Sequence, residues 1–409
     1  MSWIPDPSTR HPLSWPTFTR DCLPPILLYY VTALLVITPR TFPIRLALLP
    51  ITLYAAFRCA THIDLVKGYP DEEHLVYLNQ GLVLAMTTLG TRASIWTFQI
   101  DPYQRLQKYR PSPTPNAFLD ALDLCFNLRG IGWSWSSGLK IPTETRNTSS
   151  KLSFILSTLR SLLISFVCFD FFHLAVQSFS LPLSTLTTQN TTNTFASPSG
   201  ASIFDPALPP PIRYLRSSLI TFLSGLVVYH AIHTLYLLVS LVSLTLLAHT
   251  PAQWPPVFHA PWFATSLNEF WACRWHQVFR HLFIAAGGTP VLFLFGRAAS
   301  VLGVFLVSAL LHYIGLWGMR RGTDFARVGG FFLMMGVGTL AEHAYRALTG
   351  RRVGGVAGWA WAVLWVLGWA NLLVEAWLIR GLAGSAFLPH ASRPSVLVLR
   401  WVDSWIQIP

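Results

Sequence analysis

Two stretches decide the fold, SVLGVFLVSALLHYIGLW at residues 300–317 and SLNEFWACRWHQVFR at residues 266–280. The first is an apolar run with one ionisable side chain, His312, and it is close to the length that a membrane helix needs. An ionisable residue inside a membrane is costly and generally faces a cavity or a partner. The second stretch crowds Trp, Arg and His together, which suggests a cavity that takes a large, partly anionic ligand.

The composition indicates an integral membrane protein. Of the 409 residues, 52% are hydrophobic and only 11% are charged, whereas a soluble domain has about 25% charged residues. We attribute the net charge of +12 to basic loops that face the cytosol and anionic lipid headgroups, and not to nucleic-acid binding. A minor part of this charge is available to attract an anionic cosubstrate such as a coenzyme A thioester.

The hydropathy pattern predicts an all-α polytopic fold of about eight transmembrane helices that enclose a reaction tunnel. We expect residues 1–22 to form an N-terminal tail and residues 23–409 to form a single domain. Segment 279–296 is apolar but is broken by glycines and a proline, so we expect a re-entrant or interfacial hairpin there. The predicted spans are 23–39, 44–60, 76–98, 153–178, 218–247, 299–318, 329–347 and 355–379.

Two loops predict the topology. Residues 99–151 are basic, whereas residues 179–212 contain no Lys or Arg, so the positive-inside rule places the first loop in the cytosol and the second in the lumen. We therefore expect glycosylation at Asn190 and not at Asn147. Segment 249–280 then returns to the cytosolic side. Beyond it the rule is ambiguous, because arginines flank the 329–347 helix at both ends.

His312 has two interpretations. A neutral imidazole in a dry tunnel can take a proton from an alcohol as the alcohol attacks an activated carbonyl. Alternatively, the ring is bonded to a backbone carbonyl or a hydroxyl and holds helices together. Ser308 lies one turn earlier on the same helix face. The helix alone leaves both interpretations open.

The aromatic residues of 266–280 also have two interpretations. Trp271 and Trp275 suit an interfacial aromatic belt. Arg274 and His276 are interleaved with them, however, so large functional groups occupy every face of the short helix, which favours a binding site. Asn268 directly precedes the aromatic residues.

The start of that helix carries a capping signal. Ser266 is the expected N-cap, with Glu269 at the third helical position as in a capping box. A helix N-terminus also favours an anionic ligand.

Several other polar residues fall in predicted spans. We expect Asp170 and His173 to pair with each other or with Arg160, and no metal site is expected. For His230 and His233 we favour structural hydrogen bonds over substrate contact. The pairs Glu342 with His343 and Asn371 with Glu375 either line the tunnel or link helices. The five cysteines are far apart in the chain and show no metal-binding or disulfide spacing.

The order FWACRWHQVFR (270–280) and then SALLH (308–312) resembles the membrane-bound O-acyltransferase superfamily. The closer likeness is to its wax-synthase-like branch, whose motif reads approximately FWGRRWHQ before a helix with SGxxH. NLRGIGWSW (127–135) is similar to a stretch in fungal members, among them acetyltransferases of terpenoid and meroterpenoid pathways. Ala272, Cys273 and Ala309 depart from the pattern, and the change at 273 removes one expected anion contact.

This resemblance implies that His312 is the catalytic histidine. It also implies that the acyl-CoA chamber is lined by Asn268, Trp271, Arg274, Trp275 and His276. The expected activity is acyl transfer, first of all acetyl from acetyl-CoA, to a hydroxyl of a lipophilic terpenoid acceptor.

The expected setting is the endoplasmic reticulum membrane, with acyl-CoA as cosubstrate, no bound cofactor, and contact with membrane lipid. Two alternatives stay open, a long-chain alcohol O-fatty-acyltransferase that makes wax esters and a non-catalytic transporter or lipid-binding protein.

Overall fold

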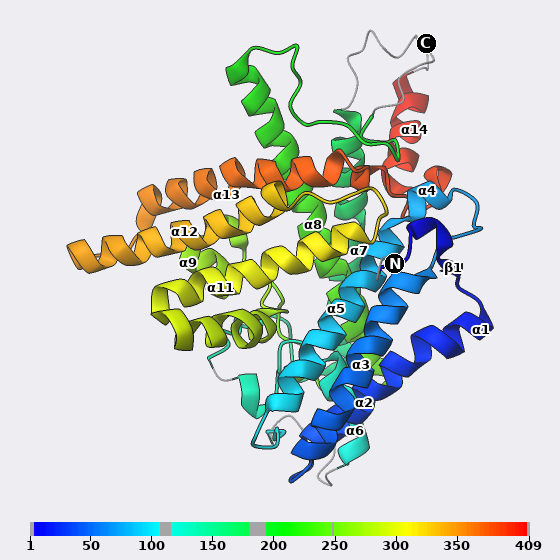
Figure 1. Cartoon of the computed structure of the whole chain (residues 1–409). Coiled ribbons are helices and arrows are strands. Elements are labelled where there is room, and N and C mark those ends of the chain that lie inside the picture. Colours follow the sequence, from blue (N-terminus) through cyan, green and yellow to red (C-terminus); the bar gives the residue numbers. More distant parts are fainter. Residues whose placement is uncertain (1–3, 107–115, 137, 180–193, 248, 407–409) are drawn as a thin grey trace. The chain divides into compact units, whose positions relative to one another are not determined.

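The computed structural model describes residues 4–106, 116–136, 138–179, 194–247 and 249–406, and it is mostly helical, as predicted (Figure 1). The chain forms two compact units, each built from separate segments. Unit 1 comprises residues 1–72, 78–144 and 252–363, and unit 2 comprises residues 73–77, 145–251 and 364–409. The assignment of residues 23–409 to one domain stays a prediction.

Unit 1 is built mostly of helices from its three segments. These are α1 (Trp15–Thr17), α2 (Leu23–Val36), α3 (Phe42–His62), α5 (Tyr77–Phe98), α6 (Ala117–Phe126), α9 (Leu267–Glu269), α10 (Arg280–Phe283), α11 (Thr289–Trp317) and α12 (Phe325–Thr349). Strands β1 (His11–Pro12) and β2 (Ile63–Asp64) pair in parallel, with His11 opposite Ile63. Unit 2 contains α7 (Lys151–Ser178), α8 (Pro210–Leu246) and α14 (Pro394–Ile406). α4 (Glu72–Leu75) and α13 (Gly355–Leu378) have residues in both units.

Every predicted span coincides with a helix, but the count of eight stays a prediction. Within the described residues, five helical segments have the length and apolar composition to cross a membrane: Phe42–His62, Lys151–Ser178, Pro210–Leu246, Arg280–Trp317 and Gly355–Leu378. α2 has 14 residues, and it continues directly from α1 and the π-helical turn Phe18–Cys22 that precede it.

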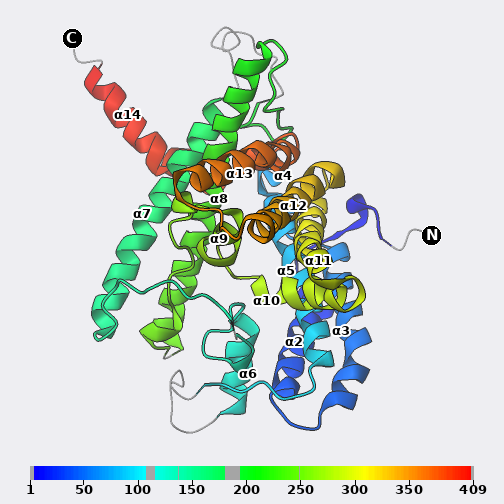
Figure 2. The same ribbon diagram turned by 90° about the vertical axis from the view of Figure 1, so that its left-hand side faces the viewer.

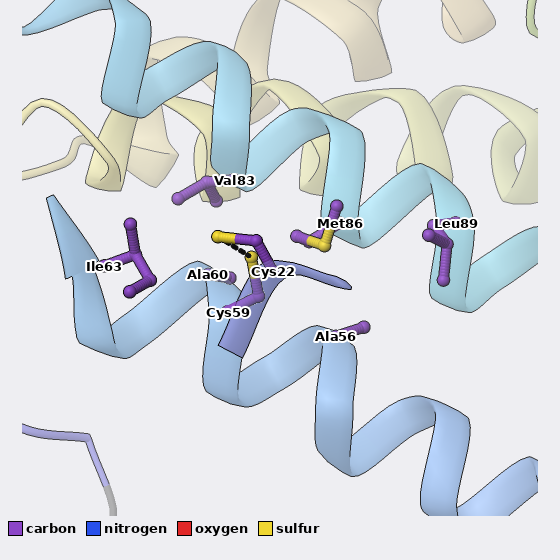
Figure 3. Packing of buried hydrophobic residues seen from close by; sticks show 8 residues of the cluster. All are labelled: Cys22, Ala56, Cys59, Ala60, Ile63, Val83, Met86 and Leu89. Carbon is purple, nitrogen blue, oxygen red and sulfur yellow. Dashed lines mark hydrogen bonds between the residues drawn. The ribbon is translucent and has the colours of Figure 1, made fainter. Parts of the chain in front are cut away.

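The first helices of unit 1 pack around a cluster of small and sulfur-containing side chains (Figure 3). Figure 3 shows Cys22 and Cys59 side by side beneath Val83 and Met86 of α5. The two Sγ atoms are 3.7 Å apart and in hydrogen-bond contact. Both cysteines are free thiols. Cys22 and Cys59 are therefore close in space although they are far apart in sequence, and they pack in the core as small apolar groups do.

Arg92 and Gln80 are polar residues within the predicted span 76–98, and α5 continues through both. The Arg92 guanidinium donates to the Leu124 and Cys125 carbonyl oxygens, both at 2.9 Å, and to the Tyr29 hydroxyl at 2.6 Å. It also lies 4.7 Å from the Trp96 ring centroid. Because the last carbonyls of a helix lack partners within the helix, Arg92 both satisfies its own donors and caps the C-terminus of α6.

Residues 280–317 form a helical hairpin (Figure 1). The prediction of a hairpin within 279–296 is wrong in its position, because the first arm stays helical through Gly287, Gly288 and Pro290. The turn is at Gly296, whose φ of 81° and ψ of −175° interrupt α11 and lie in a region that only glycine occupies readily. The arms touch where a Cβ on Gly303 would lie 2.7 Å from the Gly287 carbonyl oxygen. Ser300 Oγ donates to the Gly288 carbonyl at 2.8 Å and holds the arms in register.

α11 then packs along α12, and Figures 1 and 2 both show the two helices side by side. The second arm of the hairpin carries His312. The hairpin therefore fixes the position of this histidine relative to the segment that precedes α10.

In unit 2, α7 packs against α8, and its polar residues form a structural network. The prediction that Asp170 and His173 pair with each other or with Arg160 is wrong, because their partner is Arg393. Asp170 accepts from Arg393 Nε at 2.6 Å and from the Ser395 backbone N–H at 2.8 Å. His173 Nε2 lies 2.8 Å from the Ala383 carbonyl oxygen. This network fastens the start of α14 to the middle of α7.

Candidate active site

The candidate site begins at Ser266, which caps α9 as predicted by accepting from the Glu269 backbone N–H at 3.0 Å. The predicted anion at this helix start is a side chain of the protein itself. Glu342 of α12 accepts from the backbone N–H groups of Leu267 at 2.6 Å and Asn268 at 3.0 Å. Glu342 Oε1 also accepts from Trp361 Nε1 at 3.0 Å. Glu342 therefore links α9 to α12 and α13, which is the second of its two predicted roles.

The motif itself is one turn of π-helix, Phe270–Arg274, which ends when Trp275 adopts an extended conformation. Such wide turns occur mostly as single turns and often at functional sites. The aromatic rings of this turn pack on each other. Phe270 stacks on Trp275 with centroids 5.4 Å apart, and Trp275 lies 5.6 Å from the His276 ring. The aromatic residues thus form a packed wall within the protein.

His312 is held in one tautomer by its own helix. Its Nδ1 lies 2.8 Å from the Ser308 carbonyl oxygen. A carbonyl oxygen only accepts hydrogen bonds, so Nδ1 carries the proton and Nε2 keeps its lone pair. The ring packs on Phe332 of α12 with centroids 4.5 Å apart. The geometry thus fixes the orientation of the ring and makes Nε2 the basic atom of its neutral form.

A chain of ring contacts joins this histidine to the π-helical turn. Phe332 contacts Phe331 at 4.8 Å between centroids, and Phe331 contacts Trp271 at 6.3 Å. Trp271 also contacts Phe305, two turns before His312 on α11, at 5.9 Å. The structure therefore brings together two motifs that are well separated in sequence.

Two buried polar atoms at this wall have no hydrogen-bond partner among the described residues, Trp271 Nε1 and His276 Nδ1. Burial, and then the nearby His312 and Arg129, lower the pKa of His276 to about 3. The imidazole is therefore neutral near pH 7. An unpaired buried donor costs free energy, so these atoms suit a ligand that carries hydrogen-bonding oxygens.

Arg274 is used largely within the protein. Its Nε donates to Glu269 Oε1 at 2.7 Å, and its Nη1 donates to the carbonyl oxygens of His259 at 3.0 Å and Ala260 at 3.2 Å. Burial favours the neutral form of Glu269, but the Thr265 N–H and Arg274 outweigh it and lower the pKa of this carboxyl. The Nη2 atom of Arg274 takes part in none of these three hydrogen bonds.

The segment NLRGIGWSW also reaches this region. Its glycines form the predicted turn, with φ of 71° at Gly130 and 84° at Gly132. The Trp135 ring lies 4.5 Å from the His281 ring, and Arg129 Nη1 donates to the Pro255 carbonyl oxygen at 3.0 Å. The segment therefore packs against both flanks of the 266–280 stretch.

Of the predicted site residues in unit 1, Asn268 is the one that lies away from the aromatic wall. It lines a cavity of about 400 Å³ together with the basic residues Lys140, Arg346 and Arg352. The sequence interpretation missed these three. Lys140 was counted only in the basic charge of loop 99–151, and Arg352 only among the arginines that left the topology ambiguous.

The remaining predictions concern unit 2 and the loop between α7 and α8. His230 Nδ1 lies 3.1 Å from Ser165 Oγ, which supports its predicted structural role. His233 packs on the Tyr229 ring with centroids 5.8 Å apart. Asn371 and Glu375 link segments, because Asn371 bonds Thr221 and Glu375 accepts from the Ile203 N–H at 2.8 Å. The predicted glycosylation site Asn190 lies outside the described residues.

The chain belongs to the membrane bound O-acyl transferase family, whose match covers residues 254–334 and so spans both the π-helical turn and His312. It is 30% identical over 280 residues to the acetyltransferase ataH of Aspergillus terreus, which covers 64% of this chain and 88% of that protein. It is 31% identical over 170 residues to the acetyltransferase spyB of Aspergillus fumigatus, covering 35% of this chain and 28% of that protein.

A plant relative, the probable long-chain-alcohol O-fatty-acyltransferase 7 of Arabidopsis thaliana, is 33% identical over 140 residues, which is 32% of this chain and 41% of that protein. The predicted likeness to the wax-synthase-like branch and its fungal members is therefore confirmed. The chain is a membrane protein and an O-acyltransferase.

Proposed function

We propose that this protein transfers an acetyl group from acetyl-CoA to a hydroxyl of a lipophilic terpenoid or meroterpenoid, with His312 as the general base. The observation that carries the proposal is the bond from His312 Nδ1 to the Ser308 carbonyl oxygen. It assigns the proton of the neutral ring to Nδ1 without the help of a carboxylate, so Nε2 is the atom that can take a proton. A neutral imidazole is the form of histidine that general-base catalysis requires.

The proposed reaction starts with the acceptor hydroxyl at Nε2. His312 takes the hydroxyl proton while the oxygen attacks the thioester carbonyl carbon. The carbon–sulfur bond then breaks, and the departing sulfur takes the proton from Nε2, which gives the ester and CoA-SH and returns His312 to its neutral form. No covalent enzyme intermediate is needed, so orientation of the two substrates supplies much of the rate enhancement.

Trp271 and His276 suit the negative charge that develops on the thioester oxygen. Both have a buried nitrogen without a partner in the described part of the chain, and the Trp271 indole N–H can only donate. Donors aimed at such an oxygen are worth about 10²–10³ in rate. Trp275 provides packing for the acyl chamber, and Arg274 keeps Nη2 for the donor.

Acetyl is favoured over a long acyl chain because two Aspergillus relatives bear the name acetyltransferase, and one of them is matched over most of its length. The wax-synthase alternative follows from the plant relatives named as long-chain-alcohol O-fatty-acyltransferases. We place the enzyme in the endoplasmic reticulum, with acyl-CoA entering from the cytosol and the acceptor from the bilayer, and no other cofactor is part of the proposal.

The test is acyl transfer by microsomes that contain the protein. Radiolabelled acetyl-CoA or palmitoyl-CoA is supplied with either a mixture of hydroxylated terpenoids or a long-chain alcohol, and the extracted lipids are analysed. We expect label from acetyl-CoA in a terpenoid ester, and no label when His312 is replaced by Ala. Label that appears only from palmitoyl-CoA in wax esters would establish the alternative.

A further inference from the structure

The cavity beside Asn268 is a feature of unit 1 that the proposed mechanism does not use. It measures about 400 Å³, which is within the usual size of small-molecule sites. Residues from loop 99–151, from the 266–273 segment and from the end of α12 line it: Lys140, Ser266, Asn268, Glu269, Cys273, Glu342, His343, Arg346, Arg352 and Val353.

The charges on its walls are not balanced. Within the described residues, Lys140, Arg346 and Arg352 form no ion pair and no side-chain hydrogen bond. The two carboxylates of the lining are already bound elsewhere. Glu269 pairs with Arg274 at 2.7 Å, and Glu342 accepts from two backbone N–H groups and the Trp361 indole. Three cationic side chains therefore face the cavity without a partner.

The cavity also adjoins the candidate active site. Cys273 and Asn268 lie on its wall, while Trp271 of the same π-helical turn belongs to the aromatic wall that leads to His312. One short segment thus contributes to both places. A ligand with a phosphate-rich end and a reactive end fits this arrangement.

The lining also resolves the topology that the arginine counts left ambiguous. Arg346 and Arg352 share the cavity with Lys140, so the end of α12 lies on the side of loop 99–151. Of the arginines that precede α12, Arg320 pairs with Asp64 at 2.8 Å and with Glu72 at 2.6 Å. On the predicted topology, the three cations of the cavity lining therefore lie on the cytosolic side.

We propose that Lys140, Arg346 and Arg352 bind the phosphates of the nucleotide end of the acyl-CoA donor. The proposal rests on the proposed acyl-CoA-dependent function. The same phosphate chemistry occurs in anionic lipid headgroups, but the segment 266–273, which the cavity shares with the candidate active site, favours the donor. Charge-assisted bonds from arginine to phosphate supply the binding energy.

The first experiment measures binding of 3′,5′-ADP, the nucleotide fragment of coenzyme A, to the full chain in phosphatidylcholine nanodiscs. Lys140→Gln, Arg346→Gln and Arg352→Gln are each expected to weaken binding about tenfold, and Arg346→Lys is expected to keep most of it. Arg351→Gln is the matched control, since it removes a neighbouring exposed arginine outside the cavity lining. Equal binding by Arg352→Gln and Arg351→Gln would overturn the proposal.

The second experiment compares donors. With Arg346→Gln or Arg352→Gln, the KM for acetyl-CoA is expected to rise about tenfold while the KM for acetyl-pantetheine, which lacks the nucleotide, stays unchanged. A wild type that binds 3′,5′-ADP but transfers no acyl group from any thioester would refute the proposed function and leave the binding site standing. Transfer that these variants leave unaltered would refute the binding site alone.

The lipid arm repeats both measurements in nanodiscs with phosphatidylserine. If the three cations serve headgroups, the Gln variants will change only the response to phosphatidylserine, and 3′,5′-ADP binding will match the wild type. That outcome would assign the cavity to lipid and overturn the proposal. Thermal unfolding midpoints equal to the wild type exclude loss of fold as the cause of weakened binding.

Discussion

Replacing Glu342 with Gln tests whether this carboxylate holds the active-site segment. Glu342 Oε1 accepts from the Leu267 N–H and the Trp361 indole, and Oε2 accepts from the Asn268 N–H. A glutamine keeps one oxygen, so its amide NH₂ must face one of these donors. Leaving one buried donor unpaired costs about 1–3 kcal/mol, and each of the two remaining bonds loses about 1 kcal/mol of charge assistance. The expected loss of unfolding free energy is about 3–5 kcal/mol.

The assay is chemical unfolding in detergent, followed by tryptophan fluorescence. Asp101→Asn is the control, because it removes an exposed carboxylate from the same unit. Trp361→Phe, alone and combined with Glu342→Gln, completes a double-mutant cycle for which we expect a coupling energy of about 1 kcal/mol. Since Glu342 fixes the backbone just before Trp271, kcat should fall together with stability.

The reasoning fails if Glu342→Gln costs less than about 1 kcal/mol, or no more than Asp101→Asn. A cycle without measurable coupling would show that Trp361 and Glu342 act independently. Normal kcat in a clearly destabilised Glu342→Gln protein would separate the fold of the segment from its function.

Three further predictions concern the candidate active site and one concerns the topology. His312→Ala should reduce acyl transfer by about 10²–10⁴-fold with normal membrane insertion, and near-normal turnover would remove its catalytic role. Glycosidase treatment should shift the wild type and Asn147→Gln but not Asn190→Gln, and the reverse pattern would invert the topology. Arg274→Ala should raise the KM for acetyl-CoA more than the KM for the acceptor, and Arg274→Lys should lower the KM for acetyl-CoA only part of the way back because lysine lacks the planar guanidinium. An unchanged KM for acetyl-CoA in Arg274→Ala would exclude a contact between Arg274 and the donor. The pKa of His276 is about 3 in the folded protein and about 6.5 in the unfolded protein, so between these values only the unfolded state binds the proton, and the free energy of unfolding should fall as the pH drops below about 6.5. The His276→Asn variant should lose less unfolding free energy than the wild type between pH 7 and pH 5, and an equal loss would contradict the burial of this ring.

Helix positions could be predicted from the sequence because they depend on local hydropathy and on glycine and proline. The hairpin at 280–317 was predicted only in part, since its turn lies at Gly296, where glycine allows a positive φ, and not at Gly287 and Gly288. The partners of buried charges could not be predicted. Asp170 pairs with Arg393, 223 residues away, and Arg92 caps a helix from a different part of the chain. Such pairs depend on the tertiary arrangement, which local periodicity does not encode.

The candidate site shows the same division. The motif around Trp271 and the histidine at 312 stand out because large polar groups are rare in apolar sequence. For Glu342 the sequence predicted a helix link as one of two roles, but not its partners, since a carboxylate on a helix gives no sign of which distant helix start it will bind. The lining arginines at 346 and 352 were visible only as charge, because a cavity is a property of the assembled walls.

The bond that sets the tautomer of His312 has a consequence for how this enzyme changes over evolutionary time. Its acceptor is a main-chain oxygen at position 308, so no codon change there removes it, and the serine hydroxyl is not required for it. An enzyme that orients its base through a carboxylate side chain can lose that orientation by a single nucleotide substitution. Here the tautomer of His312 depends on the helix backbone, so directed evolution for new acceptors can vary the side chain at position 308 and keep the hydrogen bond that orients the base.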